Sequence, residues 1–135
     1  MFIHQYIIRV RYAETDQMGV VYHGNYVTYL EVGRVEYMRS IGFVYKDFEK
    51  EGYLMPVVHC SLDFKNPAVY DDELIIETRI EELPTSKITF LYQIKRKTDN
   101  TLICNAKVIL VFLNSATFRP VKSSQKLIDL LQDKI

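Results

Sequence analysis

The sequence has no tryptophan and little cysteine, with only Cys60 and Cys104 in 135 residues. Two cysteines without CxxC spacing do not build the disulfide framework of a small secreted domain, so we expect reduced, half-buried thiols in a cytoplasmic protein. No stretch of about 18 apolar residues is free of charge, which excludes a transmembrane helix. Arg9 and Arg11 interrupt the apolar residues near the start, so we expect no signal peptide.

An excess of charge of one sign is also missing, because 17 Lys and Arg balance 17 Asp and Glu. Dedicated nucleic-acid-binding proteins are usually far more basic, so we expect no nucleic-acid partner. Near-neutrality removes self-repulsion and favours association between copies. Apolar residues make up 48% and charged residues 25%, which is close to the globular average and excludes disorder, collagen and coiled coil. The length fits one domain, 1–135, that needs no metal or disulfide.

What is present is a regular alternation of apolar and polar residues, typical of strands with one covered face. The expected strands are 6–12, 56–64, 72–83, 86–98 and 102–113. A helix is expected at 24–41, a mobile segment at 43–54, and a short amphipathic helix after Pro120. Short connections between the last three strands require antiparallel neighbours.

The expected long helix carries apolar residues on more than one side. One stripe at helical spacing consists of Tyr26, Leu30, Gly33, Tyr37 and Ile41, while Val32 and Val35 fall on the opposite side. Such a helix is usually enclosed, so we expect an α+β domain in which a curved antiparallel sheet wraps around it, the hotdog fold. A cystatin-like sheet has a similar element order. The charged residues Glu31, Arg34 and Glu36 are interpreted as an intrahelical charge set.

The segment between the first strand and the helix holds the chemistry. It contains Asp16, a flexible Gly19, and His23 immediately before the helix start. The N–H groups and positive dipole at a helix N-terminus favour developing negative charge. A carboxylate facing such a terminus supplies both a base or nucleophile and an oxyanion donor, as acyl transfer requires. The alternative is that Asp16 only caps the loop and His23 is a structural histidine.

The loop reads Asp16-Gln-Met-Gly-Val-Val-Tyr-His23, and Asn25-Tyr26 and Tyr29-Leu-Glu31 follow on the helix. This run resembles the 4-hydroxybenzoyl-CoA thioesterase family of hotdog proteins, most closely the branch of the Tol-Pal-associated acyl-CoA thioesterase. The strand order and the Phe118-Arg-Pro-Val121 segment extend the resemblance over nearly the whole chain. It implies hydrolysis of an acyl-CoA thioester, with coenzyme A as part of the substrate and no separate cofactor.

The resemblance also implies roles for individual residues. Asp16 matches the catalytic aspartate, acting either as a nucleophile that forms a mixed anhydride or as a general base on water. The backbone N–H near His23 matches the group that polarises the thioester oxygen. The His23 side chain and Tyr22 are further candidates, for positioning or proton transfer and for the wall of the site. Glu31 is the alternative carboxylate, since another hotdog branch uses one on the central helix.

Substrate contacts are expected beside the loop and from polar groups suited to the anionic coenzyme. The expected set is Val21, Asn25, Tyr26, His59, Ser86, Lys87 and Arg119. A short or medium aliphatic acyl group and an aromatic one both remain open. No residues have metal-ligand spacing, so no metal is expected. The open sheet edges suggest pairing with a second copy. The resemblance implies a homodimer or homotetramer with a substrate slot between subunits. An acyl carrier protein thioesterase, a non-catalytic acyl-CoA-binding module and a cystatin-like inhibitor are the alternatives.

Overall fold

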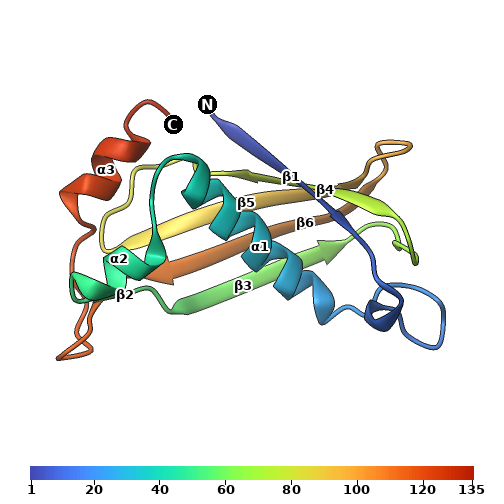
Figure 1. Ribbon diagram of the computed structural model, residues 1–135, viewed down its shortest axis with the longest axis horizontal. Coiled ribbons are helices and arrows are strands. Elements are labelled where there is room, and N and C mark those ends of the chain that lie inside the picture. The colour runs from blue at the N-terminus through green and yellow to red at the C-terminus, as the bar shows by residue number, and fades with distance from the viewer.

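The alternating stretches form a curved antiparallel sheet, and a long helix crosses one of its faces (Figure 1). The computed structural model describes all residues, 1–135. In spatial order the five strands are β1 Ile3–Arg9, β4 Glu73–Arg79, β5 Lys87–Arg96, β6 Leu102–Val111 and β3 Val57–Phe64. The other elements are η1 Tyr12–Glu14, α1 Asn25–Ser40, α2 Tyr45–Lys50, β2 Tyr53–Leu54, β7 Leu113–Asn114 and α3 Gln125–Leu131.

The period-2 pattern predicts correctly which residues face the helix. Leu74, Ile76, Thr78 and Ile80 of the β4 region are fully buried, and every second residue of β5 from Ile88 to Ile94 is buried as well. The antiparallel order of β4, β5 and β6 is also confirmed. The strands are shorter than expected, because their ends turn into loops: the third ends at Arg79 and the fourth at Arg96.

The first strand lies three residues earlier than the sequence pattern predicts. β1 ends at Arg9, and Tyr12, expected at the covered face, is 77% exposed at the start of η1. The change occurs because the Glu14 carboxylate accepts the Arg11 N–H at 2.8 Å, which turns the chain out of the sheet. The inward phase of Ile8 and Val10 is nevertheless correct, since Val10 is buried.

Helix α1 packs on the sheet through the predicted stripe, all of whose members are buried. Gly33 permits close approach, because a Cβ there would lie 2.6 Å from Ile76 Cγ2 and 2.9 Å from Thr78 Oγ1. The opposite side of the helix is open: Val27 is 50% exposed. Within one chain the helix is therefore not enclosed on several sides, because the five strands cover only the side toward them.

The segment 43–54, expected to be mobile, is ordered instead. Phe43 and Phe48 are buried, and the Phe48 ring stacks on Tyr53 with centroids 4.5 Å apart. This aromatic cluster holds α2 and β2 against the end of the sheet near α3 (Figure 1). The sequence pattern does not indicate this helix, because six helical residues are too few to show a helical period.

Both outer strands leave an edge unpaired, and β3 is the more exposed of the two. Seven of its eight residues are exposed, including Val58 at 58% and Phe64 at 51%. Cys60 on this strand is exposed and Cys104 is fully buried, so the expectation of two half-buried thiols is wrong, although both are free. None of the helices combines the length and the apolar character that crossing a membrane would need.

Candidate active site

The loop between η1 and α1 is a tight hairpin at one end of the sheet (Figure 1). The Asp16 N–H donates to the Val20 carbonyl at 2.9 Å, and the Gly19 N–H donates to the Asp16 carbonyl at 2.9 Å. Gly19 has φ +82°, which a side chain would oppose. A bridge between Thr15 and Val21 closes the hairpin. The backbone thus holds Asp16 in a fixed position ahead of the helix.

The Asp16 side chain has one oxygen occupied and one free. Oδ1 accepts the Met18 N–H at 2.9 Å, which is the Asx turn that aspartate commonly forms. Oδ2 has no hydrogen bond, and no lysine or arginine pairs with the carboxylate. The loop-capping role considered from sequence is therefore real, yet it leaves an oxygen that can take a proton or attack a carbonyl.

The start of α1 presents unused donors. The N–H groups of His23 and Gly24 donate to no acceptor, whereas the Asn25 N–H reaches the Tyr22 carbonyl at 2.9 Å. Free N–H groups at the positive end of a 16-residue helix are suited to a developing oxyanion. A carboxylate and an oxyanion donor are thus provided by one short loop.

Glu14 anchors this loop and was not anticipated as a functional residue. Its carboxylate accepts the Arg11 N–H at 2.8 Å, the Arg11 guanidinium at 2.9 Å and the Tyr29 hydroxyl at 3.0 Å. Partial burial alone would raise the pKa of Glu14, but these donors outweigh it and lower the pKa. The Glu14 carbonyl also accepts the Asn25 side-chain amide at 2.8 Å, so Asn25 clamps the loop to the helix.

We expect Glu14→Gln to lower the free energy of unfolding by about 1 to 2 kcal/mol at pH 7, because hydrogen bonds to a charged acceptor are lost. The pKa of Glu14 in the folded protein lies below the ordinary pKa of a glutamate. The charged carboxylate therefore stabilises the fold at any pH above the ordinary pKa, and this stabilisation is lost as the pH falls through the pKa of the folded protein. Urea unfolding at pH 7 and about pH 3 measures this. If wild type exceeded Glu14→Gln in unfolding free energy by the same amount at both pH values, the prediction would be contradicted. Glu82→Gln is the control, because Glu82 is exposed and forms no ion pair.

A cavity of about 270 Å³ lies beside the helix start, against the end of edge strand β3. Val21, His23 and Tyr26 line it, as expected for residues flanking the loop. The rest of its wall is Phe64, Lys65, Asn66 and Pro67. Burial raises the pKa of Tyr26 to about 12, so its phenol stays neutral at physiological pH. Asp16 itself does not line this cavity.

The remaining predicted residues lie elsewhere within one chain. Tyr22 is 49% exposed, with its ring 4.5 Å from that of His23. His59 pairs with Ile109 on the sheet face away from α1. Ser86, Lys87 and Arg119 lie at the opposite end of the sheet from the loop. One chain thus gathers Val21, His23 and Tyr26 and leaves the proposed coenzyme contacts distant.

The helix charges do not form the expected set. Glu36 pairs with Arg39, but Arg34 has no ion pair and is half-buried between α1 and the sheet. Sequence reasoning also missed Lys65, the one cation of the small cavity. The spacing of Glu31 and Arg34 permits a pair without requiring one, and nothing in the residues around Lys65 places β3 beside the helix start.

Comparison with known proteins identifies the family. The model of the thioesterase-like superfamily matches residues 10–131. The chain belongs to the thioesterase-like superfamily. YneP of Bacillus subtilis is 37% identical over 122 residues, which cover 90% of this chain and 88% of that one. The acyl-CoA thioesterase YbgC of Haemophilus influenzae is 32% identical, covering 84% and 83%.

Among solved structures, the DHNA-CoA thioesterase of Staphylococcus aureus superposes with a TM-score of 0.92 at 30% identity, covering 98% of this chain and 91% of that one. The expected family, the hotdog fold and a thioester hydrolase are therefore confirmed, and the cystatin-like alternative is excluded. The YbgC relative fits the Tol-Pal-associated branch that the loop resembles.

Proposed function

We propose that this thioesterase hydrolyses acyl-CoA esters and that Asp16 is its catalytic carboxylate. The observation that carries the proposal is the loop, where a carboxylate with a free Oδ2 precedes a helix whose first N–H groups are unpaired. The acyl-CoA thioesterase name of the YbgC relative supports the substrate class.

In the reaction, the thioester oxygen would accept the N–H of His23 or Gly24. Asp16 would remove a proton from water as the water oxygen bonds to the acyl carbon. The C–S bond would then break, and the proton would pass to the departing thiolate of coenzyme A. Alternatively, Asp16 would attack directly and form a mixed anhydride that water opens. Single-turnover hydrolysis in ¹⁸O water distinguishes them in one direction: unlabelled acid in the first turnover requires the anhydride.

The proposed coenzyme contacts would become part of the same site only with a second copy. The exposed edge of β3 suits antiparallel pairing with the β3 of another chain. Such pairing about a two-fold axis would turn the partner's far sheet end toward the loop. The groups offered for coenzyme phosphates, Ser86, Lys87 and Arg119, lie at that far end. We therefore propose that the active unit is a homodimer, or a tetramer of two such dimers.

The carrier and acyl group are tested by a hydrolysis screen over acyl-CoA chain lengths with one aromatic thioester included. Aliphatic acyl-CoA is the favoured class. If the protein hydrolysed acyl carrier protein esters and used every CoA ester poorly, the carrier of the acyl group would be acyl carrier protein instead of coenzyme A.

We expect His23→Ala to lower kcat by less than about 10-fold, because the backbone N–H of residue 23 survives the substitution. His23→Pro removes that N–H and should lower kcat by about 100-fold or more. Steady-state hydrolysis, with circular dichroism to verify folding, measures both. If His23→Ala lost as much activity as His23→Pro, the imidazole would be the essential group instead of the N–H.

A further inference from the structure

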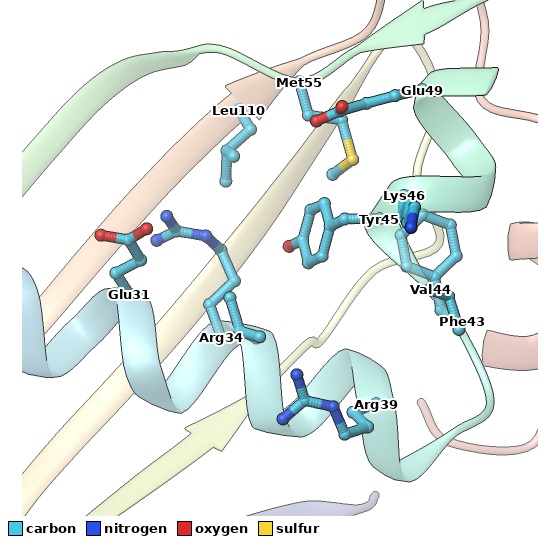
Figure 2. Close-up of a pocket in the computed structure, with 11 residues that line it drawn as sticks. Glu31, Arg34, Arg39, Phe43, Val44, Tyr45, Lys46, Glu49, Met55 and Leu110 are labelled. Carbon is cyan, nitrogen blue, oxygen red and sulfur yellow. The ribbon is translucent and has the colours of Figure 1, made fainter.

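The largest cavity in the chain, about 480 Å³, lies away from the loop, between α1, α2 and the end of β6 (Figure 2). Its apolar wall includes Val35, Phe43, Met55 and Leu110. This volume falls within the range of small-molecule sites, which are largely apolar with a few convergent polar groups.

The convergent polar group here is the guanidinium of Arg34, which forms no ion pair, although Glu31 lies on the same cavity wall and attracts it from beyond ion-pair distance. Arg34 is half-buried, and no carboxylate oxygen lies within 4.0 Å of it. Arg96, which is also only partly exposed, is paired with both Asp72 and Asp99. Arginine in a protein is always charged, and buried charges are normally paired. Arg34 is thus the one half-buried arginine of this chain that forms no ion pair within 4.0 Å.

Two phenols face the same guanidinium. The hydroxyls of Tyr45 and Tyr92 lie near Arg34, yet both are buried and neither makes a hydrogen bond of ordinary geometry. Tyr92 is only 2% exposed. Figure 2 shows the Arg34 guanidinium and the Tyr45 hydroxyl pointing into the same space. Burial raises the pKa of both phenols, so both remain neutral donors.

We propose that Arg34, Tyr45 and Tyr92 bind a carboxylate at the far end of the acyl group, so that the enzyme prefers thioesters of dicarboxylic acids. A guanidinium fork matches a carboxylate with two parallel hydrogen bonds, and each phenol adds a donor. The half-buried cation balances a single negative charge, and Glu31 and Glu49 on the cavity wall disfavour a ligand that carries the second charge of a phosphate dianion. The apolar wall suits the methylene chain.

The link to the acyl group rests on the proposed function. Antiparallel pairing of two β3 strands sets the Val57 end of one against the Phe64 end of the other. The large cavity lies at the first end, through Met55 and Leu110, and the cavity beside the helix start lies at the second. The two cavities of opposite chains then adjoin, and an acyl group held near one loop would extend toward the partner's Arg34.

The test compares adipoyl-CoA with hexanoyl-CoA, which share six acyl carbons and differ by the terminal carboxylate. We expect wild type to show at least a 10-fold higher kcat/KM, roughly, for adipoyl-CoA. Arg34→Gln should erase that ratio, and Tyr45→Phe and Tyr92→Phe should each reduce it about threefold. Tyr37→Phe is the matched control, since its hydroxyl is also buried and unpartnered but its neighbours are Phe2, His4 and Phe90.

Equal use of the two esters by wild type overturns the proposal, as does an unchanged ratio in folded Arg34→Gln. If Arg34→Gln fails to fold, the two tyrosine variants decide, because each removes only an unpaired hydroxyl. Calorimetric binding of both esters to Asp16→Asn separates this proposal from the proposed function. If adipoyl-CoA binds more tightly but the wild-type protein hydrolyses neither ester, the carboxylate site is supported and the proposed hydrolysis is refuted. If the two esters bind equally, the carboxylate site is refuted, whether or not the protein hydrolyses them.

Discussion

Asp16→Asn should lower kcat for acyl-CoA hydrolysis by at least about 100-fold, roughly 2.7 kcal/mol of transition-state stabilisation. The reason is that an amide oxygen neither accepts a proton nor attacks a thioester as a carboxylate does. Asparagine keeps the Oδ1 acceptor, so the hydrogen bond from the Met18 N–H is retained. The substitution therefore removes the chemistry and leaves the loop folded.

Asp16→Ala provides the comparison, because it removes the turn acceptor as well. We expect it to lose activity to the same extent and also to cost about 1 kcal/mol of unfolding free energy. Urea unfolding and thiol-release kinetics on the three proteins measure both quantities. Wild-type turnover by folded Asp16→Asn would contradict the assignment and direct attention to Glu31, the exposed carboxylate on α1.

Cys60→Asp should convert the protein to monomers and reduce activity by about 100-fold or more. Cys60 is exposed on edge strand β3, so a carboxylate there is hydrated in the single chain. Pairing of two β3 strands would bury two such carboxylates close together, and unpaired buried charge is very costly. Separated chains would lack the partner contacts that the proposed substrate slot requires.

Sedimentation equilibrium and activity over a range of protein concentrations measure this effect. Ile3→Asp is the control, since Ile3 is 49% exposed on β1, the other edge strand. A fully active wild-type monomer would contradict the dimeric site. Monomers from Ile3→Asp but not from Cys60→Asp would assign the interface to β1.

The sheet and the long helix could be predicted because their buried residues recur at regular spacing in the sequence. The stripe from Tyr26 to Ile41 and the alternation through Ile76 and Phe90 each report a face that excludes water. This regular spacing does not mark where a strand or helix begins or ends. The first strand ends early because the Arg11 N–H donates to the Glu14 carboxylate, a contact that the spacing of apolar residues does not indicate. Helix α2 was not predicted because its six residues are too few to show a helical period.

The site was predictable only where it is contiguous in sequence. Asp16 and His23, just ahead of α1, are seven residues apart in one short loop, so the loop could be identified from its residues. Lys65 reaches the site through the pairing of β3 with β6, a long-range contact. Arg34 and Tyr92 likewise approach each other only once α1 packs on β5. Such placements follow from topology and leave no local pattern.

The central claim is that this chain hydrolyses acyl-CoA thioesters. The most direct test is the release of free coenzyme A thiol by the purified wild-type protein, followed with an aliphatic acyl-CoA series. The account predicts multiple turnovers at roughly 1 to 1,000 per second on the best ester, the usual range for enzymes. A folded protein that binds these esters and releases no thiol at any protein concentration would contradict it.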